Sequence, residues 1–161
     1  NILGPLSNPA RTRRQLIGVF DGRWIEPIAR TLKIAEAERI WVVHGSDGLD
    51  EITTTGPTEV AELSEGEVRR FTIHPEQAGL TLSQPADLKG GDAAANASAI
   101  RSVLDGDRGP FRDIVVFNAA AALIIAGRAD TLEKGAELAA ASIDTGAAMD
   151  RLTRLAAVSH G

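Results

Sequence analysis

The residues best suited to chemistry lie in the acidic segment His44 to Glu51, directly after the apolar run Ile40 to Val43. Neighbouring carboxylates such as Asp50 and Glu51 repel each other unless a positive charge lies beside them. Mg²⁺ accepts one or two carboxylates and keeps several waters, and a bound diphosphate would complete its shell. The spacing fits a magnesium site at Asp50 and Glu51. Spacing alone is a weak signal, since neighbouring acids are common in loops, and it favours a solvated loop in which Asp50 caps a turn and Glu51 faces water.

His44 and the segment Gly90 to Asp92 are the other candidates for chemistry. His44 has no recognisable serine or cysteine partner, so we expect a hydrogen-bonded residue at a strand end rather than a general base. The backbone amides of Gly90 and Gly91, before a helix, could bind a phosphate. A capping carboxylate from Asp92 would occupy those amides, and this favours a plain helix start.

The composition excludes several functional classes. The chain has 161 residues, a formal net charge of −5 and no cysteine. Disulfides and thiolate chemistry are thereby excluded, and we expect a reducing compartment, the cytoplasm. No apolar run is long enough to span a membrane, and the acidic balance argues against binding of nucleic acid. The one basic run, Arg11, Arg13 and Arg14, is more typical of a solvated turn or an ion-pair face.

The elements that must position the acidic segment are those of an α/β domain. Apolar runs at Gln15 to Phe20 and Ile40 to Val43 are typical of strands buried on both faces. The stretch Trp24 to Ala37 between them carries apolar residues at helical spacing, namely Ile25, Ile28, Ala29 and Leu32. A crossover of this length joins parallel strands, so we expect a mostly parallel sheet with the acidic segment outside its carboxyl edge.

The second half of the chain predicts an antiparallel hairpin and then helices. Thr58 to Ile73 has two apolar stretches around the turn Ser64 to Gly66. After a long connection, His74 to Lys89, Asp92 is expected to cap a helix that ends at Gly106.

Two more helical regions follow. Asp113 to Ala126 is apolar almost all round, which predicts a helix buried on every side. Asp130 to Glu133 has the form of a capping box and opens a last helical region, to about Ala157, with a break near Gly146. The length of the chain predicts a single domain with one core. Because it begins at Asn1 without methionine or a leader, we expect it to be part of a longer protein.

The order and intervals of these motifs resemble the anthranilate phosphoribosyltransferase family over essentially the whole chain. The segment Asn1 to Pro9, which locally predicts a tight turn, opens the resemblance. The other matching segments are Val42-Val43-His44-Gly45, Asp47-Gly48-Leu49-Asp50-Glu51, Gly56-Pro57-Thr58, Gly90-Gly91-Asp92-Ala93, Asn96-Ala97, Gly109-Pro110, Arg112-Asp113, Asn118-Ala119-Ala120 and Ala126-Gly127.

The resemblance implies transfer of a phosphoribosyl group from phosphoribosyl pyrophosphate to anthranilate in tryptophan biosynthesis, with Mg²⁺ as cofactor. It places the magnesium ligands at Asp50 and Glu51. It also implies a nucleoside phosphorylase/phosphoribosyltransferase-like α/β domain, of which residues 1–161 would be the C-terminal portion. The family's small helical domain, through which the complete enzyme usually forms a homodimer, would precede this chain.

The resemblance assigns no catalytic residue to this chain. The family's glycine-rich pyrophosphate loop, its Lys-His-Gly-Asn segment and the arginine that meets anthranilate all lie upstream of the matched region. Stabilising a departing pyrophosphate requires amides, cations and metal positioned around one point, so we expect this chain alone to be inactive.

Two alternatives remain open from the sequence. A pyrimidine nucleoside phosphorylase shares the overall fold, although the motifs at Asn1 to Pro9 and Asp47 to Glu51 fit the transferase better. A non-enzymatic nucleic-acid-binding relative would need a basic face, which the net charge of −5 disfavours.

Overall fold

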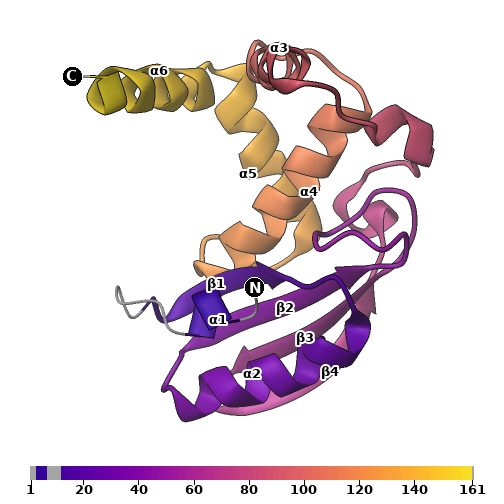
Figure 1. The fold of residues 1–161 in the computed structure, drawn as a ribbon, viewed down its shortest axis with the longest axis vertical. Coiled ribbons are helices and arrows are strands. Elements are labelled where there is room, and N and C mark those ends of the chain that lie inside the picture. The colour runs from indigo at the N-terminus through magenta and orange to yellow at the C-terminus, as the bar shows by residue number, and fades with distance from the viewer. Residues whose placement is uncertain (1–2, 7–11, 161) are drawn as a thin grey trace.

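A four-stranded sheet lies between two layers of helices in the computed structural model, which describes residues 3–6 and 12–160 (Figure 1). The strands are β1 (Arg14–Gly18), β2 (Arg39–Gly45), β3 (Thr58–Ser64) and β4 (Glu67–Ile73), hydrogen-bonded in that order. The α/β class predicted from the sequence is confirmed. The first strand ends two residues earlier than expected, and Phe20 is 60% exposed.

The sheet is mixed, whereas the sequence predicts a mostly parallel one. β1 and β2 are parallel, with Gly18 opposite Val43, because a helix crosses over between them. β3 returns antiparallel to β2, and β4 antiparallel to β3. The connection of residues 46–57 contains no helix and stays at one end of the sheet, so β3 has to run in the opposite direction. The predicted hairpin around Ser64 to Gly66 is confirmed.

One face of the sheet is covered by α2 (Ile25–Ile34). A single 3-10 turn, Gly22–Trp24, leads into it and is capped by the Asp21 side chain. All four residues predicted to share the apolar face of this helix are buried. They pack against side chains of β1, β2 and β3 on the face of the sheet that α2 covers. This packing confirms the crossover predicted between β1 and β2.

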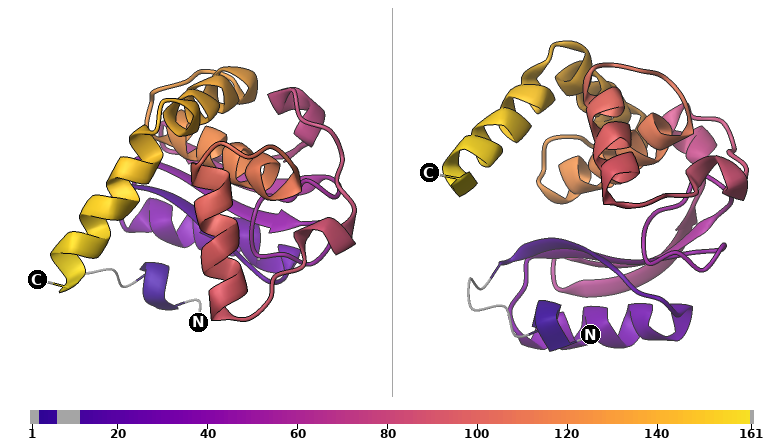
Figure 2. Two further views of the ribbon diagram at one scale, coloured as in Figure 1. Left: turned by 90° about the horizontal axis from the view of Figure 1, so that it is seen from above. Right: turned by 45° about the horizontal axis from the view of Figure 1, so that its top comes forward.

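The opposite face is covered by α4 (Pro110–Ile125), against which α5 (Leu132–Asp144) packs (Figure 2). Gly135 of α5 lies so close to Ala120 that a Cβ atom there would come within 2.8 Å of the Ala120 backbone. The carboxyl end of α4 is fixed to the sheet, because Arg14 donates to the Ile125 carbonyl (3.4 Å) and Arg39 to the Ile124 carbonyl (2.7 Å). The Ile124 carbonyl also accepts from the Gly127 N–H at 3.0 Å, so Arg39 adds a second hydrogen bond to it.

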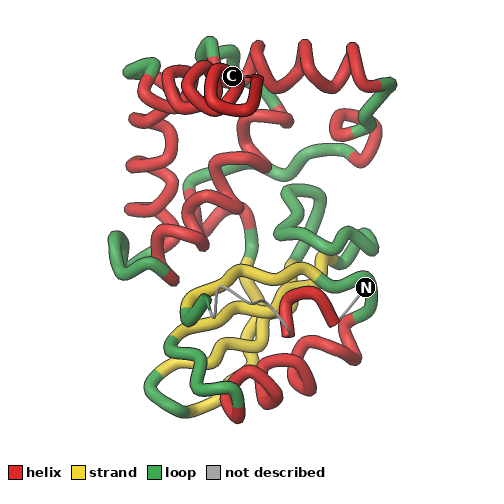
Figure 3. The backbone as a smooth tube through the Cα atoms, turned by 60° about the vertical axis from the view of Figure 1, so that its left-hand side comes forward, coloured by secondary structure: helices red, strands yellow, loops and turns green. Residues whose placement is uncertain are grey.

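The helix α4 is not buried on every side. Val115 is 44% exposed, and the side that it occupies lines a groove of about 810 Å³ between α4, α5 and the start of α6 (Ala147–His160). In Figure 3 the strands form a layer with α2 on its outer side, while the C-terminal helices fill the opposite part of the molecule. The apolar sequence of α4 therefore serves one buried face and one open face.

The remaining elements are α3 (Ala93–Leu104), two 3-10 turns (Pro75–Ala78 and Pro85–Leu88) and the single turn α1 (Leu3–Leu6). Asp92 caps α3 as predicted, but Val103 is the one buried residue of that helix. The residue that caps α5 is Thr131 and not Asp130, one residue later than the expected capping box. Thr131 has extended backbone dihedrals, and its side chain accepts from the Lys134 backbone N–H. The predicted break near Gly146 separates α5 from α6.

Apart from α1, the turn predicted for Asn1 to Pro9 lies outside the described residues, as does Arg11. Of the helices that the structure describes, none is both long and apolar enough to cross a membrane.

Candidate functional site

The acidic segment lies at the carboxyl ends of the parallel strands β1 and β2, where the sequence predicts it. It belongs to the connection of residues 46–57 between β2 and β3. The Asp50 backbone carbonyl lies against Gly18, the last residue of β1, and a Cβ atom at Gly18 would come within 1.4 Å of that oxygen. Glycine is therefore required at the end of β1 for the acidic segment to pack there.

The Asp47 carboxylate organises the segment from inside. It accepts hydrogen bonds from the Thr53 and Thr55 hydroxyls at 2.6 and 2.7 Å, and from the Leu49 amide at 3.1 Å. Partial burial alone would raise the pKa of Asp47, but these hydrogen bonds outweigh it and hold the pKa below the ordinary value. The Asp47 carboxylate is thus committed to hydrogen bonds inside the loop, whereas Asp50 and Glu51 are exposed.

A second contact fixes the loop to α4. The Asn118 side-chain amide accepts from the Ile52 N–H (3.1 Å) and donates to the Ile52 carbonyl (2.8 Å). Ile52 is fully buried and directly follows the acidic pair. The backbone on both sides of the pair is therefore held by neighbouring elements.

Asp50 and Glu51 themselves are exposed. Within residues 3–6 and 12–160, neither carboxylate has a hydrogen bond or ion pair, and no group of three or more His, Cys, Asp and Glu side chains could hold a metal ion. Two free carboxylates on a fixed backbone suit the partial protein shell that Mg²⁺ uses when waters and phosphate oxygens supply the other ligands. The assignment of these residues as metal ligands stays a prediction.

His44 is a hydrogen-bonded residue at the end of β2, as expected. Its Nδ1 lies 2.9 Å from the Val19 carbonyl oxygen, which can only accept, so Nδ1 carries the proton. That contact ties β2 to the segment after β1 and supports a structural role.

The segment Gly90 to Asp92 leads into α3, and two backbone amides at this helix start have side-chain acceptors. The Asp92 side chain accepts from the Ala95 amide at 2.8 Å, and the Asn96 side chain accepts from the Gly91 amide at 2.9 Å. The helix start capped by Asp92 is confirmed.

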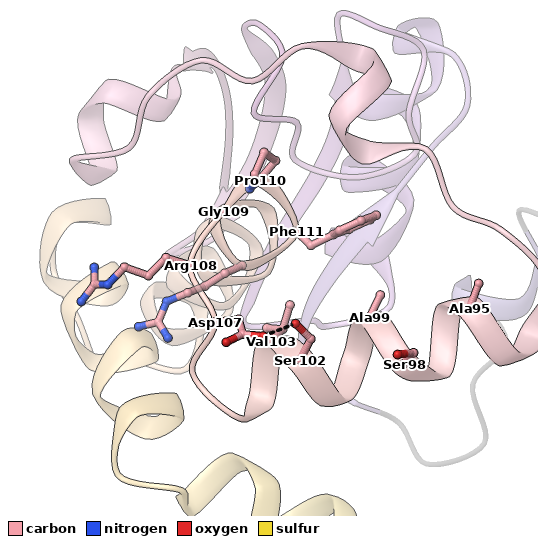
Figure 4. A pocket seen from close by; sticks show the side chains of 11 residues that line it. Ala95, Ser98, Ala99, Ser102, Val103, Asp107, Arg108, Gly109, Pro110 and Phe111 are labelled. Atoms are coloured by element: carbon pink, nitrogen blue, oxygen red, sulfur yellow. Dashed lines mark hydrogen bonds between the residues drawn. The ribbon is translucent and has the colours of Figure 1, made fainter.

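A separate hollow of about 480 Å³ lies between α3 and the start of α4 (Figure 4). Its carboxylate, Asp107, accepts a hydrogen bond of 2.6 Å from Ser102, drawn as the dashed line in Figure 4. The Arg108 side chain extends away from Ser98 and Ala99 on the helix opposite. Arg112, which also lines the hollow, is paired with Asp144 at 2.7 Å.

A sequence model described as "Glycosyl transferase family, a/b domain" matches residues 1–149. The chain belongs to this family. It is 58% identical over 160 residues to an anthranilate phosphoribosyltransferase of Paramagnetospirillum magneticum, covering 99% of this chain and 46% of that protein. It is 56% identical over 161 residues to an anthranilate phosphoribosyltransferase of Bradyrhizobium diazoefficiens, covering 100% of this chain and 48% of that protein. The chain spans about half the length of the curated relatives it matches.

Solved structures agree with the family assignment. The crystal structure of anthranilate phosphoribosyltransferase from Thermus thermophilus matches with a TM-score of 0.88 and 34% identity, over 99% of this chain and 47% of that one. The Saccharomyces cerevisiae enzyme in complex with PRPP and Mg matches with a TM-score of 0.85 and 24% identity, over 94% of this chain and 44% of that one. At that identity the yeast structure supports the fold alone.

The sequence identified the acidic segment but did not reveal the contacts that fix its backbone. Gly18 and Asn118 are distant from it along the chain, and Asp47 was grouped with the two other acids rather than with the threonines. The alternation Thr53, Thr55 after an aspartate is a local signal that could have revealed that hydrogen-bonded loop.

Proposed function

We propose that this chain is part of an enzyme that transfers a phosphoribosyl group from phosphoribosyl pyrophosphate to the amino group of anthranilate, with release of pyrophosphate. The observation that carries the proposal is the 58% identity, over 99% of the chain, to a protein named anthranilate phosphoribosyltransferase. The relatives from Bradyrhizobium and Thermus have the same name, so no observation favours a pyrimidine nucleoside phosphorylase or a nucleic-acid-binding protein.

We further propose that Asp50 and Glu51 hold Mg²⁺ at the pyrophosphate. Support comes from their exposure at the carboxyl edge of the parallel strands, where ligands bind in α/β sheets. The yeast enzyme of the same fold, solved in complex with PRPP and Mg, points the same way. A bound Mg²⁺ would neutralise charge that develops on the departing pyrophosphate oxygens. The part of this chain is to carry the two carboxylates on a loop that packs against Gly18 and is held by the hydrogen bonds of Asp47.

The complete enzyme is proposed to be a cytoplasmic homodimer in which this chain supplies the C-terminal portion of a larger α/β domain. The relatives are about twice as long as the matched region, which supports a larger domain. So do the unpaired edge of β1 and the apolar groove along α4, since both are surfaces that further chain could cover. Positioned amides and cations for the transition state would come from that further chain, and no catalytic residue is proposed within this one.

The test is an assay of the full-length protein, meaning this chain joined to the remaining half that its relatives have. With phosphoribosyl pyrophosphate and Mg²⁺, we expect anthranilate fluorescence to fall and one pyrophosphate to appear per anthranilate consumed. This chain alone should give no turnover, because the resemblance places the glycine-rich pyrophosphate loop and the arginine that meets anthranilate upstream of it. Phosphorolysis of a pyrimidine nucleoside without anthranilate consumption would overturn the proposal, and turnover by this chain alone would overturn the division of roles.

A further inference from the structure

Asn118 makes contacts that the packing of α4 does not require. Its Oδ1 accepts from the Ile52 N–H at 3.1 Å, and its Nδ2 donates to the carbonyls of Ile52 (2.8 Å) and Ile114 (3.0 Å). The amide therefore pairs with both backbone groups of one residue, 66 positions away, in the way that a neighbouring strand would. No other side chain of similar size has an acceptor and a donor so placed, because Asp lacks the donor and Leu lacks both.

The residue held in this way determines where the acidic pair lies. Ile52 follows Glu51 directly and is fully buried, whereas the carboxylates of Asp50 and Glu51 are exposed and touch no described polar group. Their directions are therefore set by the backbone and not by contacts of their own. A metal site works only when its ligands are held within a fraction of an ångström. Because Ile52 is joined to Glu51 through the backbone, restraining Ile52 also restrains the backbone that carries the two carboxylates.

The surroundings leave the backbone little freedom to compensate. On one side the Asp50 carbonyl is pressed against Gly18, with no space even for a methyl group. On the other side Thr53 is fully buried and donates to Asp47. The helix α4 is in turn fixed to β2 by Arg39. The sheet, the acidic loop and α4 thus form one connected unit in which Asn118 is the link from the helix.

We infer that Asn118 is a positioning residue for metal binding: through Ile52 it holds the Asp50–Glu51 backbone so that both carboxylates meet one divalent cation. The inference rests on the proposed magnesium site and adds a residue from α4 to it. Removing a residue that orients metal ligands typically weakens metal affinity by about 10–100-fold, and we expect an effect of this order here.

The experiment uses the full-length protein with phosphoribosyl pyrophosphate and measures Mn²⁺ binding from the electron paramagnetic resonance signal of the free ion. Asn118→Ala and Asn118→Asp should weaken Mn²⁺ binding about tenfold or more. They should also raise the Mg²⁺ concentration for half-maximal turnover by a similar factor. Should Asn118→Ala fail to fold, Asn118→Ser keeps one hydrogen-bonding group and is expected to give a smaller shift in the same direction.

Val116→Ala is the matched control, since Val116 is buried on the same helix, packs in the same core as Ile52 and makes no side-chain hydrogen bond. It should lower thermal stability while leaving Mn²⁺ affinity unchanged. If Val116→Ala weakens Mn²⁺ binding as much as Asn118→Ala, the effect is general destabilisation and the inference is wrong.

The double variant Asp50→Asn with Glu51→Gln separates this inference from the proposed function. If the double variant loses Mn²⁺ affinity and Asn118→Ala does not, the metal site stands and the positioning role is overturned. If the double variant binds Mn²⁺ normally, the acidic pair is not the metal site, and the proposed site and the role of Asn118 fail together.

Discussion

The Glu62 side chain is fully buried in β3 and still has ionised partners. It accepts from the Trp41 indole at 2.9 Å and from Arg69 at 2.6 Å, with Arg39 at 3.3 Å. Burial raises the pKa of Glu62, but the Trp41 and Arg69 hydrogen bonds and the two positive charges outweigh it, so the pKa lies below the ordinary value of 4.5. The sequence does not predict this group of interacting side chains, because the three partners of Glu62 come from two other strands.

Glu62→Gln should destabilise the protein by about 2 kcal/mol, because it leaves two guanidinium groups facing a neutral amide. The loss should stay below that for a fully buried pair, since the Arg69 side chain is 70% exposed. Urea unfolding measures the change. The matched control is Glu59→Gln on the same strand, whose half-exposed ion pair with Arg70 is expected to contribute less than about 0.5 kcal/mol. Equal effects of the two substitutions would contradict this account of Glu62.

At the residue scale, the sequence indicated which residue types could bind a metal but not which residues contact them in the folded protein. Asp50 and Glu51 could be singled out because two adjacent carboxylates repel each other unless a positive charge lies beside them. The contacts that hold them could not be, since Gly18 and Asn118 come from β1 and α4 and meet the loop only after the chain has folded.

At the scale of elements, the helix α2 and the hairpin were predicted correctly, whereas the direction of β3 and the burial of α4 were not. The apolar face of α2 and the turn of the hairpin are local signals, and both were confirmed. The direction of β3 depends on whether the segment after β2 crosses over, which loop composition does not reveal. The apolar circumference of α4 predicted burial on all sides, whereas Val115 borders an open groove.

The contact between the end of β1 and the acidic loop gives a prediction for Gly18→Ala. The new methyl group would fall 1.4 Å from the Asp50 carbonyl oxygen, so the loop has to move. We expect destabilisation of about 1–3 kcal/mol from overpacking and a higher Mg²⁺ requirement in the full-length protein. Gly66→Ala is the control: it introduces strain at a positive φ of 78° with nothing within 4 Å, so stability should fall while the Mg²⁺ requirement does not change. A normal Mg²⁺ requirement for Gly18→Ala would contradict the contact.

For the whole molecule, the lowered pKa values predict how stability depends on pH. Asp47 and Glu62 have folded pKa values below their ordinary values of 3.8 and 4.5, so above about pH 4.5 both contribute fully to stability. As the pH falls through 4.5 and 3.8 towards the folded values, the unfolded state takes up protons first and this stability is lost. Asp113, whose pKa burial raises despite Arg112 and Arg108, opposes the trend in part.

Urea unfolding at a series of pH values tests the prediction. The wild-type protein should lose stability below about pH 4.5, and the loss should be smaller in Glu62→Gln, which has no proton to gain at that position. An identical pH profile for the two proteins would show that Glu62 does not titrate as described.

The family and the α/β class could be recognised from sequence because ordered motifs run along the whole chain, whereas the mixed sheet and the open groove emerge only from the assembled molecule. The same holds for the proposed function. Two carboxylates in a loop are a weak signal alone, and their place beside the ends of two parallel strands gives them meaning.

The most direct test of the account is a Mg²⁺ titration of turnover by the full-length protein carrying Asp50→Asn and Glu51→Gln. The double substitution removes two charges and nearly preserves side-chain shape, so the cation loses its protein ligands. The account predicts a higher Mg²⁺ requirement and lower turnover, since such ions supply several kcal/mol of stabilisation, with little change in thermal stability because both carboxylates are exposed. A wild-type titration curve at wild-type turnover would contradict it and leave Asp50 and Glu51 as a solvated loop.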